Sequence, residues 1–595
     1  MPKFFTPVLL VCAFVALSAT EAATEDPGRS DADVRLDWGV KIPLAEEIGL
    51  GATLYRPIDS GDQRLTTIVT ITPYISDRYH PDALYFARSG FAFLIVDTRG
   101  RGNSEGEFLP LGIEDGTDGA QVVQWVAEQP WSNGKVALRG GSYGGYNQWA
   151  TARYFPEALK TIVPIAAPYH GIDFPMNLNV QYPYTIRWLT LTSGVTPQGR
   201  MFGDSNFWQQ KFRAYHREGI AFTELARLVG NNHPQFLEWA SHPQQDDYWA
   251  ARVPTEDQYK KLDLPILTIT GYYDGDQPGA MEYYRRHMRS ADRKARDQHY
   301  LLLGPWDHGG TRFPRQTFGG YTFGDAMMFD AFQLDRDWYR WAMDDGEFPD
   351  FLKDRVTYFV AGANTWKSAP SLEEISSETQ TLYLQSDGSA DRPFGGGELA
   401  VQAPGDASVD QYVYDPLDVT KALRTPAEDY ILDQTEVMLT EGDGLIYHSA
   451  RFAEPLEISG YITFEGWFEL DVPDTDINVT LYEVRADGSS VALTGQPMRV
   501  RYRNGLDEAE PFSPGSVERL VFDQFYFFSR QVAKDSRLRL FIRPANNVEQ
   551  QRNYNSGKVV AQETRADARV ATVRLHAGAG RGSRLVLPVV REANP

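Results

Sequence analysis

Hydrophobic positions in the first third of the chain form short, mostly apolar runs separated by helical segments. Runs without a polar face are typical of strands that are buried on both sides of a sheet. They occur at Thr67–Thr72, Phe91–Val96, Lys135–Leu138 and Ala158–Ile165. Gly116–Glu128 has helical spacing and lies between two of them. Because strands alternate with helices, we predict an α/β fold with a mostly parallel sheet flanked by helices.

The pattern changes between residues 176 and 255. Strand-like runs become rare there, and many aromatic residues occupy segments with helical spacing. The strand pattern resumes at Leu264–Thr270. We therefore predict a helical cap, residues 176–255, inserted into a core formed by residues 24–175 and 256–354.

Beyond residue 354 the chain consists mainly of short segments in which apolar and polar positions alternate. Examples are Thr379–Leu384, Leu456–Leu470 and Asn478–Val484, separated by turns rich in Gly, Pro, Asp and Asn. Such alternation is typical of half-buried strands, and a long series of them predicts a β-sandwich or jelly roll. We expect residues 355–595 to form a separate all-β jelly-roll domain.

The first 23 residues have the pattern of a signal peptide. Lys3 precedes the apolar run Pro7–Leu17, and small residues follow as far as Ala23. The run is shorter than the roughly 20 residues that a membrane-spanning helix needs, so cleavage is favoured over a retained anchor. We expect residues 1–23 to be removed and the mature chain to be exported, either to the periplasm or to the extracellular medium.

Composition narrows the classes of partner. The chain has 58 basic and 80 acidic residues, which gives a net charge of −22. The negative electrostatic potential of such a protein repels phosphate backbones and anionic lipids. The single cysteine, Cys12, lies in the predicted signal peptide, so the mature chain would contain no disulfide and no cysteine nucleophile. We expect no nucleic-acid partner and, after signal removal, no membrane partner; the sequence does not determine the oligomeric state.

A sequence motif centred on a serine provides the first candidate for a catalytic residue. Gly140–Gly144 matches G-x-S-x-G, the tight turn from a strand into a helix that presents a serine hydroxyl above a sheet. The same pattern recurs at Gly102–Gly106, so it does not identify a nucleophile by itself. Ser142 lies between a strand pattern and a helical pattern, whereas Ser104 lies in a loop of Arg, Gly and Glu. We therefore predict Ser142 as the nucleophile and Ser104 as a turn residue.

A serine nucleophile requires a general base and a carboxylate that orients the base. In α/β-hydrolases these residues follow the serine in the order Asp, then His. Asp274 comes shortly after one strand pattern and His308 shortly after the next, at the carboxyl ends of strands, where α/β sheets gather their active-site loops. We predict a catalytic triad of Ser142, Asp274 and His308.

Two groups are expected to stabilise an oxyanion: the backbone N–H of Tyr143, and a group from the loop after an earlier strand, the position of Thr72–Tyr74. With these segments the chain resembles the CocE/NonD family of serine hydrolases, which includes cocaine esterase, α-amino-acid ester hydrolases and, more distantly, X-Pro dipeptidyl-peptidases. The matching segments extend over nearly the whole mature chain: Pro73-Tyr74, Asp97–Phe108, Gly141–Gly145, Tyr273–Gly275, Gly304–His308, Pro473–Asp476 and Arg501–Arg503.

The resemblance implies an α/β-hydrolase core with an inserted helical cap and a C-terminal jelly roll packed against both. It implies that Ser142 attacks an acyl carbonyl, that His308 transfers the proton and that Asp274 holds the imidazole. The Tyr74 hydroxyl and the Tyr143 N–H would stabilise the oxyanion. We expect no cofactor and no metal.

The resemblance leaves the substrate class open. In α-amino-acid ester hydrolases a carboxylate cluster binds the substrate ammonium, with an acidic pair shortly after the triad aspartate. Here Asp276 occupies that place with Gln277 beside it, and Asp173 is a further candidate. We expect a hydrolase of small-molecule carboxylic esters or amides. The alternatives are an amino-acid ester hydrolase, dipeptidyl-peptidase or aminopeptidase that requires a free amine on an ester or peptide substrate, and a non-catalytic glycan- or peptide-binding protein.

Overall fold

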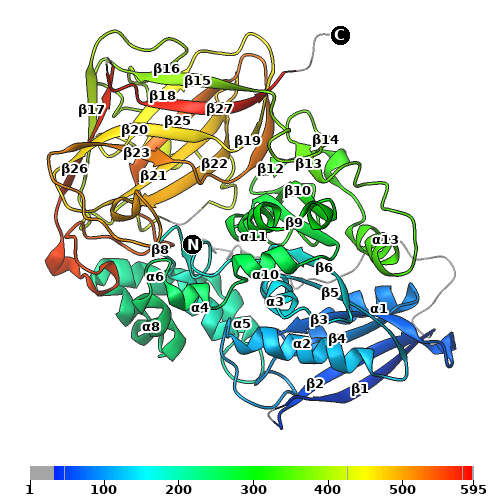
Figure 1. Cartoon of the computed structure of the whole chain (residues 1–595). Coiled ribbons are helices and arrows are strands. Elements are labelled where there is room, and N and C mark those ends of the chain that lie inside the picture. The colour runs from blue at the N-terminus through cyan, green and yellow to red at the C-terminus, as the bar shows by residue number, and fades with distance from the viewer. Residues whose placement is uncertain (1–32, 46, 425–426, 579, 592–595) are drawn as a thin grey trace, which may run out of the picture.

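The computed structural model describes residues 33–45, 47–424, 427–578 and 580–591 (Figure 1). The predicted signal peptide, residues 1–23, lies outside the described residues. Within the described ranges, no helix combines the length and the apolar character that crossing a bilayer requires.

A ten-stranded sheet forms the framework of the first part of the chain. In spatial order its strands are β1 (Val34–Pro43), β2 (Gly49–Pro57), β4 (Ala92–Asp97), β3 (Leu65–Thr72), β5 (Ser132–Gly141), β6 (Leu159–Ile165), β9 (Ile266–Tyr273), β10 (His299–Asp307), β13 (Val356–Val360) and β14 (Thr365–Ala369). The strands from β4 to β13 in this order run parallel, and the edge strands are antiparallel to their neighbours. The predicted α/β fold class, with a mostly parallel sheet, is confirmed.

Helices cover both faces of this sheet because its central strands bury side chains on both sides. Along β4, Phe93 and Ile95 pack into one apolar core, while Leu94 and Val96 pack into the other. The first core also receives two helices, α1 (His80–Arg88) and α13 (Ala331–Met343), and the second receives α2 (Glu114–Ala127) and α3 (Tyr143–Ala152). The alternation of β4 thus explains the layered arrangement.

Between β6 and β9 the chain is mainly helical. A small hairpin, β7 (Met176–Asn177) and β8 (Val180–Gln181), precedes α4 (Tyr184–Leu191), α5 (Gly199–Gly203), α6 (Ser205–Glu218), α7 (Leu225–Val229), α8 (Pro234–Ser241), α9 (Asp247–Ala250) and α10 (Glu256–Lys261). Most of the aromatic side chains of this segment share one apolar cluster that includes Tyr143 and Tyr146 of α3. The cap helices therefore pack against the helix that directly follows Ser142.

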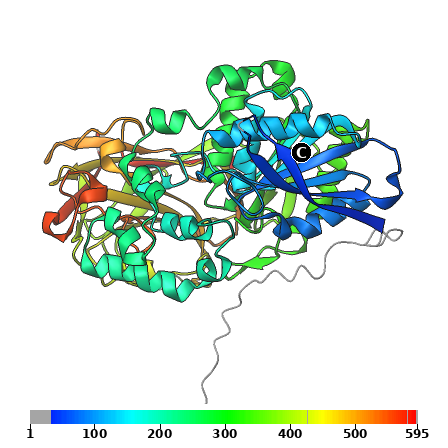
Figure 2. The same cartoon turned by 90° about the horizontal axis from the view of Figure 1, so that it is seen from below.

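The C-terminal part is an all-β domain, as predicted. Its sheet comprises thirteen strands: β15 (Glu378–Gln385), β16 (Glu398–Ala400), β17 (Ser408–Tyr414), β18 (Leu445–Ser449), β19 (Leu456–Gly460), β20 (Thr463–Leu470), β21 (Asp476–Val484), β22 (Ser490–Arg499), β23 (Val517–Phe522), β24 (Phe528–Val532), β25 (Arg537–Pro544), β26 (Ala571–Ala577) and β27 (Arg584–Val590). Buried and partly exposed positions alternate strictly along β20, the pattern of a half-buried strand. Figure 2 shows the blue strands of the first sheet on one side of the molecule and the orange and red segments of this domain on the other.

The two sheets meet at the end of β13. β13 and β14 extend the ten-stranded sheet, although the sequence predicts that the C-terminal domain begins at residue 355. Directly after β13, Ala361 N donates to Ser529 O at 3.1 Å, and Gln531 N donates to Ala361 O at 2.8 Å. A strand pattern does not specify which sheet a strand joins, so only the pairing in the folded chain shows that the first sheet continues past residue 354.

Candidate active site

Ser142 lies in the turn between β5 and α3. Its backbone angles, φ 61° and ψ −124°, are rarely adopted by residues with a side chain, and such strain is commonly retained at functional turns. Ser142 N donates to Ile165 O at 2.9 Å, which ties the turn to β6. A Cβ at Gly145 would lie 2.7 Å from the same Ile165 oxygen. The small residues of this segment therefore allow α3 to start close against the sheet, in the strand–turn–helix arrangement expected for the pattern.

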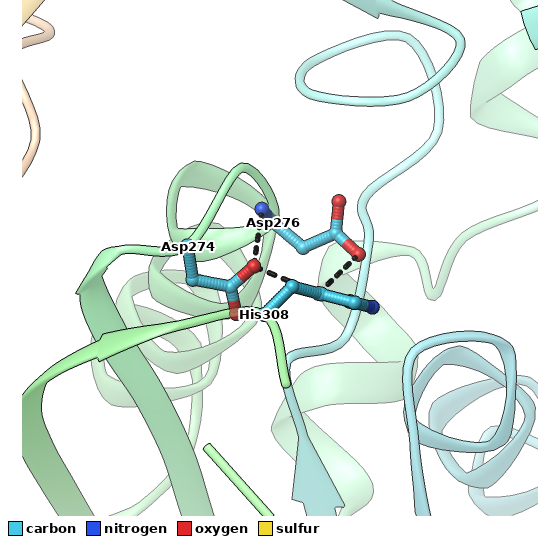
Figure 3. A group of neighbouring side chains, drawn as sticks. All are labelled: Asp274, Asp276 and His308. Atoms are coloured by element: carbon cyan, nitrogen blue, oxygen red, sulfur yellow. Dashed lines mark hydrogen bonds and ion pairs between the residues drawn. The ribbon is translucent and has the colours of Figure 1, made fainter. Parts of the chain in front are cut away.

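His308 and Asp274 come from the ends of neighbouring parallel strands. Asp274 directly follows β9 and His308 directly follows β10. Their side chains meet, with Nδ1 of His308 2.8 Å from Oδ1 of Asp274, and Figure 3 shows the ring turned toward this carboxylate and that of Asp276. Asp274 is fully buried, and its Oδ1 also accepts a hydrogen bond from Asp276 N at 3.0 Å.

The electrostatics of this pair favour a basic imidazole. Burial opposes the charged form of His308, but the carboxylates of Asp274 and Asp276 outweigh burial and raise the pKa of His308. A histidine whose Nδ1 is held by a carboxylate presents Nε2 for proton transfer, which is the geometry that a general base requires.

Ser142 and His308 line one cavity of about 500 Å³. All three parts of the chain contribute to its wall: Tyr74, Ser142 and His308 from the core, Tyr184, Trp188 and Phe212 from the cap, and Tyr526, Asn547 and Glu549 from the C-terminal domain. Among the described residues, no hydrogen bond joins the Ser142 hydroxyl to His308; in unliganded enzymes such bonds are often long and tighten when substrate binds. A larger hollow of about 1070 Å³ lies along α13 and β14, and its wall includes none of the predicted site residues.

The two predicted oxyanion donors lie beside Ser142. Tyr74 is in the loop after β3, and its hydroxyl oxygen accepts a hydrogen bond from Trp188 Nε1 at 3.1 Å. Burial raises the pKa of the Tyr74 phenol, so the phenol stays protonated and can donate. Tyr143 is the first residue of α3, where backbone N–H groups have no partner within the helix and favour an anion.

The structure brings together the two carboxylates proposed for amine binding. Asp173 and Asp276 both line the cavity. Asp276 Oδ2 lies 3.5 Å from Nδ1 of His308, and burial raises its pKa. Asp173 is buried, and its oxygens accept hydrogen bonds from Tyr169 N at 2.8 Å and Gly279 N at 2.6 Å. Burial nevertheless raises the pKa of Asp173 well above its usual range.

Several residues of the cavity wall were not predicted from the sequence. Asn177, Tyr526 and Glu549 line the cavity, and Asn177 Nδ2 lies 3.5 Å from the Tyr526 hydroxyl. The side-chain oxygen of Asn177 is buried and has no hydrogen-bond partner among the described residues. Neither a motif nor a spacing marks these residues in the sequence, because their position depends on how the cap and the C-terminal domain pack against the core.

Asp274, Asp276 and His308 also bring ligand atoms within 4.8 Å of one another, close enough to hold a metal ion. The Nδ1 atom that faces both carboxylates is already engaged with Asp274 at 2.8 Å. A metal at that nitrogen would compete with the hydrogen bond that orients the imidazole. We therefore interpret the group as a histidine with two carboxylate neighbours.

Comparison with known proteins identifies similar sequences for both main parts of the chain. The family model of the X-Pro dipeptidyl-peptidase (S15 family) matches residues 47–310, and that of the X-Pro dipeptidyl-peptidase C-terminal non-catalytic domain matches residues 352–586. Cocaine esterase of Rhodococcus sp. (strain MB1 Bresler) is 27% identical over 596 residues, which cover 94% of this chain and 100% of that protein.

Solved structures extend the likeness to the whole architecture. An aminopeptidase from a marine sediment archaeon, Thaumarchaeota archaeon, superposes with a TM-score of 0.81 at 20% identity and covers 96% of this chain and 100% of its own. An α-amino acid ester hydrolase superposes with a TM-score of 0.78 at 19% identity, with the same coverage. At such identities these structures show the fold alone. They confirm the predicted hydrolase-like core with a C-terminal all-β domain.

Proposed function

We propose that this chain cleaves carboxylic ester or amide bonds through an acyl-enzyme on Ser142. The chain is a serine hydrolase related to cocaine esterase and the X-Pro dipeptidyl-peptidases. The main support is the pairing of His308 Nδ1 with Asp274 Oδ1 at 2.8 Å, in the wall of the cavity that Ser142 also lines. The hypothesis of a non-catalytic glycan- or peptide-binding protein is set aside because the matched relatives are hydrolases.

In the proposed reaction the Ser142 hydroxyl attacks the acyl carbonyl carbon while its proton passes to Nε2 of His308. Asp274 keeps the imidazole in place and stabilises its positive charge. The Tyr143 N–H and the Tyr74 hydroxyl donate hydrogen bonds to the oxyanion. The bond to the leaving alcohol or amine then breaks, and the leaving group takes the proton from His308. Water attacks the acyl-enzyme with the same assistance, which releases the carboxylic acid and restores Ser142.

The proposed enzyme is exported to the periplasm or the medium. The support is the order of charged, apolar and small residues within residues 1–23. N-terminal sequencing of the protein from the periplasm and from the medium tests this directly. A chain that begins after the small residues near Ala23 is expected, and a full-length chain confined to the cytosol would refute export.

A second candidate function requires a free amine on the substrate. It is favoured by the two carboxylates, Asp173 and Asp276, and the buried Asn177 oxygen, which all line the cavity with Ser142. A substrate ammonium would lower the cost of ionising these buried carboxylates, because an opposite charge favours the charged form. The corresponding substrates are α-amino-acid esters or amides, including the N-terminal residues of peptides.

One experiment separates the two functions. We would compare kcat/KM for two esters of the same alcohol, one with a free α-amino group and one with that amine acylated, and use Ser142→Ala as the blank. A preference for the free amine of about tenfold, roughly 1.4 kcal/mol in the transition state, would support amine recognition, and it should disappear in Asp276→Asn. Equal rates would support a general esterase. Unchanged turnover in Ser142→Ala would refute the acyl-enzyme mechanism.

A further inference from the structure

We propose that Trp188 in the cap is a positioning residue for the oxyanion hole, and that its indole N–H sets the direction in which the Tyr74 hydroxyl donates. The inference rests on the proposed function. Trp188 belongs to α4, whereas Tyr74 lies in the loop after β3. The folded chain brings them together, with Trp188 Nε1 3.1 Å from the Tyr74 hydroxyl oxygen.

The direction of this hydrogen bond follows from the chemistry of the two groups. An indole N–H can only donate, whereas a phenol has one proton to donate and also accepts. The Tyr74 oxygen must therefore be the acceptor from Trp188, and the single phenol proton is left to point elsewhere. Tyr74 and Ser142 are close neighbours in the same cavity. The proton is thus available on the side where the oxyanion forms.

The orientation of the indole is itself restricted by its surroundings. Trp188 is only 6% exposed. Its ring stacks on Tyr143 at a centroid distance of 6.2 Å and an interplanar angle of 17°, and Phe174 packs edge-on at 5.3 Å. The Tyr143 ring is held in turn, since its hydroxyl donates to Asp115 Oδ2 at 2.6 Å.

Trp188 therefore contacts both residues that supply the oxyanion donors. Its indole N–H donates a hydrogen bond to the Tyr74 hydroxyl. Its ring packs on the side chain of Tyr143, whose backbone N–H is the second oxyanion donor. Because the indole belongs to the cap, the oxyanion hole is complete only when the cap is seated on the core. The contribution is largest when negative charge develops, since hydrogen bonds in a chain polarise one another.

The experiment removes the N–H and keeps an aromatic ring. We expect Trp188→Phe to lower kcat about tenfold, the effect of one neutral hydrogen bond, with KM changed by less than about twofold. The matched control is Trp208→Phe in α6. Trp208 is buried in the cap as well, and its Nε1–H donates a hydrogen bond to Met201 O at 2.8 Å, but Trp208 lies outside the cavity wall. Both variants lose one indole hydrogen bond, and only the first should lose kcat.

A double-mutant cycle with Tyr74→Phe shows whether the effect passes through the hydroxyl. Tyr74→Phe alone should lower kcat about 10²-fold, as for other oxyanion donors. In that background Trp188→Phe should add less than about twofold. The same tenfold loss in both backgrounds would overturn the inference, because Trp188 would then act through packing alone.

The outcomes also separate this inference from the proposed function. If Tyr74→Phe leaves kcat unchanged, the oxyanion assignment itself fails. If Tyr74→Phe is impaired and Trp188→Phe is not, only the positioning role fails. Should Trp188→Phe not fold, site-specific replacement of Trp188 by benzothienylalanine, which keeps the bicyclic shape and lacks the N–H, is expected to give the same tenfold loss, and full activity would refute the role.

Discussion

Two serines stand at the centre of the same five-residue pattern, and their surroundings differ completely. The Ser104 side chain is buried; its hydroxyl donates to Asp97 O at 2.6 Å and accepts from Gly51 N at 2.8 Å. Ser142 lies in a strained turn at the wall of a cavity that also contains His308. A G-x-S-x-G pattern therefore specifies a turn. The hydrogen-bond partners of the hydroxyl determine whether the serine has a structural role or can act as a nucleophile.

The largest expected effect comes from Ser142. Ser142→Ala should lower kcat by at least about 10⁴-fold, because the attacking oxygen is lost. The melting temperature should stay close to that of the parent chain, since Ser142 lies at the wall of the cavity and the change removes a single oxygen atom. Hydrolysis of an activated ester and thermal unfolding followed by circular dichroism check both statements. Turnover that survives in this variant would remove the distinction between the two serines.

Asp274 tests the next difference, which is that Ser142 shares its cavity with the predicted base, His308. Asp274→Asn should lower kcat by about 10³- to 10⁴-fold, because an amide no longer holds His308 in the required tautomer. Steady-state kinetics on an ester without a free amine measure this loss. The isosteric change keeps the shape, so a small effect would mean that the 2.8 Å pair does not orient the base.

Ser104 should show the opposite behaviour. Ser104→Ala leaves the Gly51 N–H and the Asp97 carbonyl without their hydroxyl partner, and the free energy of unfolding should fall by about 1–3 kcal/mol. Because Ser104 takes no part in the chemistry, kcat/KM should stay within about threefold. Urea unfolding and ester hydrolysis provide the two measurements. A large loss of kcat with full stability would instead identify Ser104 as a catalytic residue.

The last glycine of each pattern, Gly106 or Gly144, tests whether the two turns differ in how much space their backbone leaves for a side chain. Gly106 has φ +85°, and a Cβ there would lie 2.8 Å from Arg99 Cγ; at Gly144 the nearest atom to a Cβ is Ile71 O at 3.8 Å. Gly106→Ala should therefore cost about 1–2 kcal/mol of unfolding free energy, and Gly144→Ala should change it by about 0.5 kcal/mol or less. Chemical denaturation of the two variants measures the difference. Equal costs would show that both turns tolerate a side chain alike.

The smallest effect concerns the second carboxylate beside His308. The carboxylates of Asp274 and Asp276 raise the pKa of His308 against the effect of burial. The free imidazole is the active base, so activity rises with pH through this pKa. Asp276→Asn removes one of these two carboxylates, so the pKa of His308 should fall and the acid limb of the kcat/KM profile should move to lower pH. The profile is measured with an amine-free ester. A shift toward higher pH would contradict the assigned electrostatics.

The predicted strands of the first sheet illustrate what a sequence specifies locally. Thr67–Thr72 lies within β3 and Lys135–Leu138 lies within β5, because an unbroken apolar run suits a strand buried on both faces. Leu456–Leu470 shows the limit of this reasoning. It forms two strands, β19 and β20. Both pair with β27, but β19 also pairs with β24, whereas β20 pairs with β23 and β26. The alternation of apolar positions does not reveal the break between them.

The α/β and all-β parts, the turn at Ser142 and the order of serine, aspartate and histidine could all be predicted from the amino-acid sequence. These features depend on local periodicity and on turn chemistry at strand ends. The folded chain was needed to show that the Ser104 hydroxyl is hydrogen-bonded while Ser142 lines a cavity, and that Trp188 of the cap contacts Tyr74. The physical reason is that contacts between segments far apart in the chain arise from how whole elements pack, and no local pattern encodes that packing.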